Sequence, residues 1–113
     1  MTANTTPKSE PIWKYNEGPW LDKARAMIAE TYSEHYSADD DSDIQVLDGW
    51  AARNLEGTEH TCINTANKYL MRFGKKSGRN RKDLLKAIHY TVLALHFADK
   101  VDAKASKKAI SKA

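Results

Sequence analysis

The chain has 113 residues and a formal net charge of +3, with one cysteine, 5 glycines and 3 prolines. This length accommodates one domain, and no apolar run approaches the roughly 18 residues that a membrane-spanning helix needs. A single cysteine excludes an internal disulfide and a cysteine-based zinc site. Because the start of the chain has neither a basic nor an apolar signal region, we expect a cytoplasmic protein that does not bind membranes.

The spacing of apolar residues predicts an all-α fold, a small four-helix bundle at residues 18–100. A flexible arm is expected at residues 1–17 and a basic tail at residues 101–113. The first helix should begin at Gly18 and Pro19, since proline is favoured at the first helical position, and should end near Tyr36. Its expected inward residues are Leu21, Ala24, Ile28 and Tyr32.

A second helix is expected after the acidic run at residues 39–43. Ser42 and Gln45 have the spacing of a capping box, and Gly57 marks the expected end. The residues predicted to face inward are Ile44, Leu47, Ala51 and Leu55.

A third helix is predicted from Glu59 to Phe73, closed by Gly74, and a fourth should follow the loop at residues 74–79. Asn80 is its expected N-cap, with an acid three residues later. The third helix should bury Cys62, Ala66, Tyr69 and Phe73, with Ile63 and Leu70 beside them. The fourth should bury Leu84, Ile88, Val92 (or Thr91) and Leu95, and its apolar pattern thins after Asp99.

The two parts of the chain carry opposite charge. Residues 1–67 hold 5 Lys and Arg against 12 Asp and Glu, a net charge of −7, whereas residues 68–113 hold 13 against 3, a net charge of +10. A chain polarised in this way either pairs with itself or presents a cationic surface to an anionic ligand. We therefore expect a homo-oligomer, because so small a core benefits from a partner surface.

A row of polar side chains on the third helix is a candidate phosphate site: Asn64, Lys68 and Arg72 lie at i, i+4 and i+8. Arginine offers a planar fork and lysine a point charge, and an asparagine amide can contact a base or sugar. Lys75 and Lys76 continue the row into the loop before the fourth helix, whose N-terminal amides attract anions. The alternative is an ordinary solvated helix face.

Asp83, Lys86 and Tyr90 form a second candidate group at i, i+3 and i+7 of the fourth helix. Asp83 could orient a lysine, bind a divalent ion or accept a proton, although an acid in the first turn also stabilises a helix by itself. His35 is a candidate acid–base group, and the alternative is a favourable contact with the helix dipole.

The spacing of histidines and acids does not predict a metal site. His89 and His96 lie two turns apart with no third ligand, so we expect partly buried histidines with satisfied hydrogen bonds. The acidic run at residues 39–43 lacks the glycine and glutamate of a calcium-binding EF-hand loop.

Three blocks then occur in order: His35-Tyr36, the stretch from Asn64 through Lys68-Tyr69 and Arg72 to Gly74-Lys75-Lys76, and the stretch from Asp83 through Lys86-Ala87 to Tyr90. Together they resemble the SaV-like domain of unknown function of bacteriophages, whose members are often described as nucleotide kinases. The resemblance spans about residues 34–92. The chain differs by a longer Asp-rich insert after Tyr36 and by extra residues at 56–61.

The resemblance implies a nucleotide ligand. Its implied phosphate contacts are Lys68 and Arg72, with Lys75 and Lys76 close by. It also implies a substrate or metal role for Asp83 and His35, which we take as the candidate catalytic residues. We add Asn64 and Lys86 to the phosphate-binding set and expect a base to stack on Tyr36, Tyr69 or Tyr90.

Three functions follow from these expectations. The first is phosphoryl transfer from ATP with Mg²⁺ to a deoxynucleoside monophosphate. The second is a non-catalytic protein that sequesters cyclic or linear nucleotide messengers of host immunity. The third is a nucleic-acid or host-protein binding module, which the acidic half disfavours because it would repel a duplex.

Overall fold

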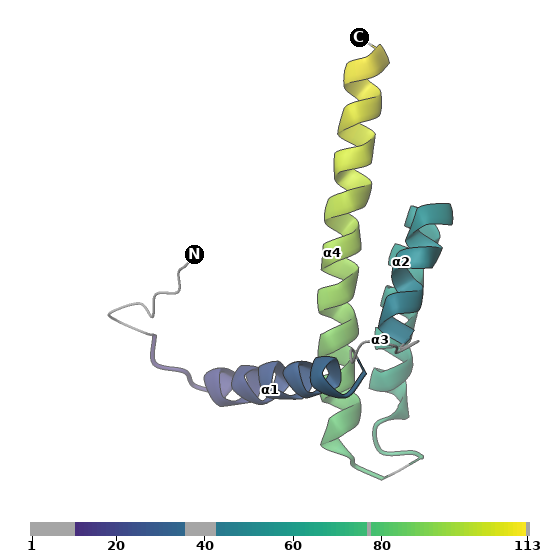
Figure 1. The fold of residues 1–113 in the computed structure, drawn as a ribbon. Coiled ribbons are helices and arrows are strands. Elements are labelled where there is room, and N and C mark those ends of the chain that lie inside the picture. The colour runs from purple at the N-terminus through teal and green to yellow at the C-terminus, as the bar shows by residue number, and fades with distance from the viewer. Residues whose placement is uncertain (1–10, 36–42, 77, 113) are drawn as a thin grey trace.

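The computed structural model describes residues 11–35, 43–76 and 78–112, except for the side chains of residues 34, 35, 43–45 and 110–112. This part of the chain contains four helices and no strands. They are α1 (Glu17–His35), α2 (Asp43–Arg53), α3 (Leu55–Arg72) and α4 (Arg81–Lys112) (Figure 1). The expected all-α fold of four helices is confirmed.

The hairpin of α3 and α4 is the structural centre of the molecule. The two helices run antiparallel (Figure 1), so Glu56 near the start of α3 pairs with Lys104 near the end of α4 at 3.7 Å. The buried residues along their contact are mostly small: Cys62 and Ala66 on α3, and Ala87 and Ala94 on α4. Small side chains let two helix backbones approach closely, and this hairpin positions everything else.

The main apolar cluster lies where α2 joins this hairpin. Leu47 of α2 packs with Cys62 of α3 and with Ala94 and Phe97 of α4. Leu47 is buried as expected, and Ala51 and Leu55 pack against the cluster from the same stripe, whereas the side chain of Ile44 lies outside the description.

The boundary between the second and third helices was predicted wrongly. Instead of a helix that ends at Gly57, α2 ends at Arg53 and Asn54 caps α3, because the Asn54 side-chain oxygen accepts a hydrogen bond from the Gly57 amide at 2.9 Å. Asparagine is among the best N-cap residues, and here its cap outweighs the breaking tendency of a glycine inside the first turn. The expected cap at Ser42 lies outside the described residues.

The inward face of α4 was also predicted wrongly. Leu84 and Ile88 are only half-buried, and Val92 and Leu95 are exposed, while the alanine stripe of the same helix faces α3. The reason is steric, since alanines permit a closer approach to α3 than leucines would. On α3 the expectation was better: Cys62 and Ala66 are buried, although the neighbouring Ile63 and Leu70 are exposed.

The connection between α3 and α4 matches the expected turn chemistry. Gly74 and Gly78 both have positive φ, at 86° and 65°, and the Gly74 amide donates to the Gly78 carbonyl at 2.8 Å. Asn80 then caps α4, because its side-chain oxygen accepts from the Lys82 amide at 3.0 Å. Glycine supplies the left-handed conformations that this turn requires.

The helix α1 lies across the direction of α4 and contacts the hairpin through α4 (Figure 1). Of its expected inward residues, Ala24 is buried and Ile28 half-buried, while Leu21 and Tyr32 are exposed. A crossing helix meets its neighbour over a short length, which explains the limited burial. At the other end of the chain, α4 continues as regular helix from Asp99 to Lys112.

We expect Ala87→Leu to lower the free energy of unfolding by about 1 to 3 kcal/mol, because a larger side chain forces α3 and α4 apart. Urea denaturation measures this change. The matched control is Ala105→Leu on the exposed side of α4, which should stay within about 0.5 kcal/mol of the parent. Equal stability of the two variants would contradict the assigned packing face.

Candidate phosphate-binding site

Three cationic side chains surround the ring of Tyr69. The ammonium of Lys68 lies 4.7 Å from the ring centre, the Arg72 guanidinium 5.4 Å and the Lys86 ammonium 5.4 Å. Lys68 and Arg72 come from α3, and Lys86 reaches the ring from α4. The hairpin therefore gathers residues from two separate sequence blocks around one aromatic ring.

Tyr90 of α4 completes this group. Its ring stacks on that of Tyr69 with centres 6.0 Å apart and planes inclined by 24°. Both tyrosines are half-buried. We name these five residues (Lys68, Tyr69, Arg72, Lys86 and Tyr90) the Tyr69 cluster.

The cluster concentrates positive charge. Within the described residues the ion pairs are His60 with Glu59 and Lys104 with Glu56, and both lie outside the cluster. Each cation gains about 0.5 to 1 kcal/mol from the ring, but the three like charges repel one another. Such a group attracts an anion with several acceptor oxygens, and a phosphate has this chemistry.

The members of the cluster differ in exposure. Lys68 and Lys86 are exposed, whereas Arg72 is half-buried against Tyr69. A held guanidinium presents its planar fork in one orientation, while flexible ammonium groups adapt as point charges. Arg72 is therefore the residue best placed to fix the orientation of a bound phosphate.

Asp83 lies one turn before Lys86 on α4 and is buried, with 5% of its surface exposed. Its Oδ2 atom has no hydrogen-bond partner in the described structure. A buried carboxylate oxygen without a partner costs free energy, so its presence favours a role beyond the stability of the helix terminus.

The remaining predicted residues do not all join the cluster. Asn64 is exposed one turn before Lys68, and Lys75 and Lys76 are exposed in the turn between α3 and α4. His35 is the last residue of α1 with its side chain outside the description, and Tyr36 lies outside the described residues.

His89 was expected to have satisfied hydrogen bonds, but the structure shows a different environment. The residue is buried, and its Nε2 atom has no partner among the described groups. Its ring centre lies 5.8 Å from that of Tyr90. Burial lowers the pKa of His89 below the ordinary 6.5, because a charge there would lose its hydration. In the sequence, the sign of this environment is that His89 directly precedes Tyr90.

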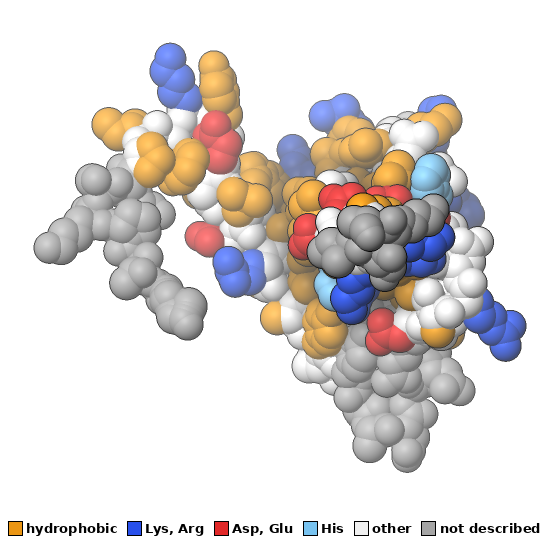
Figure 2. Space-filling view, turned by 90° about the horizontal axis from the view of Figure 1, so that it is seen from above, with side chains coloured by type: hydrophobic (Ala, Val, Ile, Leu, Met, Phe, Trp, Pro, Cys, Tyr) orange, Lys and Arg blue, Asp and Glu red, His pale blue; other side chains and the backbone are white. Residues whose placement is uncertain are grey.

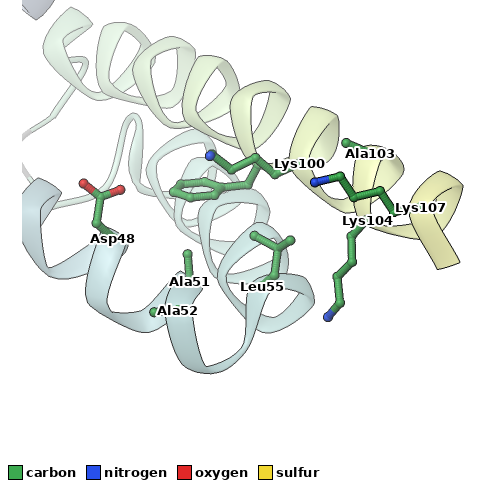
Figure 3. Close-up of a pocket in the computed structure, with 9 residues that line it drawn as sticks. Asp48, Ala51, Ala52, Leu55, Lys100, Ala103, Lys104 and Lys107 are labelled. Carbon is green, nitrogen blue, oxygen red and sulfur yellow. The ribbon is translucent and has the colours of Figure 1, made fainter. Parts of the chain in front are cut away.

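A basic hollow, separate from the Tyr69 cluster, lies toward the C-terminal end of α4 (Figure 3). It has a volume of about 480 Å³ between α2, the start of α3 and α4. Phe97, Leu55 and three alanines form its apolar lining, and Asp48 stands at one side. Lys100, Lys104 and Lys107 line the α4 side. Its lining shares no residue with the Tyr69 cluster.

The described residues lack two kinds of feature. Among them, no helix combines the length and apolar character needed to cross a membrane. Nor do the described His, Cys, Asp and Glu side chains form a group of three or more that could hold a metal ion by themselves.

Comparison with protein families matches residues 30–92 to the family described as a protein of unknown function, DUF3310. This range covers more than half of the chain and contains the whole Tyr69 cluster and Asp83. It agrees with the expected domain of unknown function, and the description names no activity. Neither the curated proteins nor the solved structures contain a match.

The environment of His89 predicts a pH dependence of stability. Because its pKa is lower in the folded chain than in the unfolded one, the unfolded chain binds more protons below about pH 6.5. The contribution of neutral His89 to the free energy of unfolding is therefore fully present above that pH and is lost as the pH falls below it. We expect His89→Gln to weaken this decrease, as measured by urea denaturation between about pH 7 and pH 5.

His60→Gln is the matched control, because His60 is exposed and its removal should leave the pH dependence of the parent in place. If both variants keep the parent's slope, the buried His89 does not control it.

Proposed function

We propose that this chain, which belongs to the DUF3310 family, is a nucleotide-binding protein that holds phosphate groups at the Tyr69 cluster. The observation that carries the proposal is the convergence of Lys68, Arg72 and Lys86 on one ring without a carboxylate in ion-pair contact among the described residues.

A nucleotide fits this surface better than a simple anion does. The stacked rings of Tyr69 and Tyr90 form an aromatic wall directly beside the cations. Bases stack on aromatic side chains, while Lys and Arg bind the phosphates of the same ligand. The basic residues of the adjacent turn, Lys75, Lys76 and Arg79, add a long-range attraction for anions.

Asp83 favours phosphoryl transfer as the second candidate function. Magnesium is commonly bound by one or two carboxylates together with substrate phosphates, and Asp83 would supply a carboxylate one turn before Lys86. Its Oδ2 atom has no hydrogen-bond partner and is buried, so the side chain would have to turn outward to reach a metal ion. When bound, Mg²⁺ would neutralise charge on the phosphates. In the reaction, the bond from the γ-phosphorus of ATP to the ADP oxygen breaks, and a bond forms to a phosphate oxygen of the monophosphate. Lys68, Arg72 and Lys86 would stabilise the transferring group.

We also propose that this chain self-associates. The opposite charges of the two parts of the chain favour contact between copies, since the acidic part of one copy attracts the basic part of another.

Arg72→Ala tests the binding site. We expect it to weaken nucleotide affinity roughly 10- to 150-fold, because a charge-assisted contact contributes about 1.5 to 3 kcal/mol. Arg72→Lys should recover part of the affinity, since a point charge replaces the fork incompletely. Calorimetric titration with deoxynucleoside monophosphates, ATP and cyclic dinucleotides measures these constants.

The matched control is Arg53→Ala, which removes an exposed arginine from the last turn of α2. It should bind like the parent. Unchanged affinity in Arg72→Ala, or an equal loss in Arg53→Ala, would refute the assignment of the Tyr69 cluster as the phosphate site.

Asp83→Asn separates binding from transfer. If Asp83 takes part in phosphoryl transfer, we expect turnover of ATP and a monophosphate to fall by about two orders of magnitude or more. Nucleotide affinity without Mg²⁺ should stay close to that of the parent. Chromatography of ADP and the diphosphate product measures turnover, and Asp99→Asn at an exposed position of α4 is the control. A parent protein that binds nucleotides without turnover would leave binding as the whole function.

A further inference from the structure

The long helix α4 carries two apolar stripes. Its inner stripe packs on α3 through Ala87, Ala94 and Phe97. The second consists of Leu84, Ile88, Val92 and Leu95, at i, i+4, i+8 and i+11, which places them on another side of the same helix. We name these four residues the outer stripe.

The intramolecular contact with α1 covers one end of the outer stripe. Trp20 of α1 and Leu84 and Ile88 of α4 line a common hollow of about 440 Å³. The side chains at the contact between α1 and α4 therefore leave space unfilled. Val92 and Leu95, farther along α4, are 48% and 63% exposed. The outer stripe is thus an apolar surface that continues beyond the part adjoining α1.

The helix α1 has exposed apolar side chains as well. Leu21 is 57% exposed, and its neighbour Trp20 is 36% exposed although it also lines the hollow with Leu84 and Ile88. Figure 2, a view down α4 from its C-terminal end, shows apolar side chains on α1 and on the adjoining side of the hairpin. In proteins, most helix stability comes from packing of an apolar face, so a helix with this exposure lacks part of its support.

Charge identifies the partner that fits. The helix α1 contains four acids and two Lys or Arg, a net charge of −2, whereas α4 contains eight Lys or Arg and three acids, a net charge of +5. Two α1 helices repel each other, as do two α4 helices. The Lys and Arg of α4 lie at residues 81–86 and 100–112, before and after the Val92 and Leu95 end, so they attract the acidic α1 of another copy from both sides of that end. The α1 helix of a second copy therefore offers the outer stripe both apolar side chains to pack against and a negative charge that complements α4.

We propose that two copies form a two-fold symmetric dimer in which α1 of each copy packs on the Val92 and Leu95 end of the other's outer stripe. The interface is self-complementary, because each copy contributes one α1 and one stripe. This arrangement buries the exposed apolar residues of both helices. It specifies the surface behind the proposed self-association and does not depend on nucleotide binding.

Leu95→Lys tests the interface. Sedimentation equilibrium of the full chain should give a dimer for the parent at micromolar concentration and a dissociation constant at least tenfold higher for the variant. Leu21→Lys on α1 should weaken the dimer in the same way. Both residues are more than half exposed in the single chain, and circular dichroism should show parent helix content.

Ile63→Lys is the matched control, because Ile63 is 50% exposed on α3, outside both contributing surfaces. It should dimerise like the parent. A monomeric parent, a Leu95→Lys variant that dimerises as tightly as the parent, or an equal loss in Ile63→Lys would each overturn the proposal.

Discussion

The close packing of α3 on α4 is the interaction on which the rest of the structure depends. Cys62 and Ala66 meet Ala87 and Ala94 along the hairpin, and their small side chains bring the two backbones together. Close packing of this kind is intolerant of added volume. The position of α2 follows from it, since Leu47 packs into a cluster that the hairpin has already formed.

The same packing assembles the candidate site. Tyr69 and Tyr90 stack because they occupy neighbouring levels of the hairpin, and Lys86 reaches the ring that Lys68 and Arg72 already flank. The like charges of the three cations disfavour one another, so the helices hold them together at an electrostatic cost. A bound phosphate would offset this repulsion, which links the stability of the site to its occupancy.

The two faces of α4 make different contacts. One face builds the core and the Tyr69 cluster with α3, and the other carries the outer stripe. A helix that is apolar on two sides needs two partners, and within one copy α1 adjoins only one end of the second side. The buried groups Asp83 and His89 lie on this same helix, with unpartnered atoms that no helix-forming tendency explains.

The sequence by itself determined the local features: four helices, the turn at Gly74, the cap at Asn80 and the spacing that puts Lys68 and Arg72 on one side of a helix. These depend on contacts within a few residues, which periodicity and turn chemistry report directly. Lys86 was added to the predicted phosphate-binding set without a reason to place it beside Lys68 and Arg72, and its shared contact with Tyr69 became visible only in the hairpin.

Only the tertiary structure decided which side of α4 faces α3. By hydrophobicity alone the leucine-rich outer stripe is the better core candidate, and the sequence interpretation chose it for that reason. The alanine stripe faces α3 instead, because helix packing depends on how closely the two backbones approach as well as on apolar area. Both helices together set that distance, so the sequence of one helix does not reveal it. The tertiary structure also decided that Asp83 and His89 each have a buried atom without a hydrogen-bond partner, since burial depends on how the helices pack.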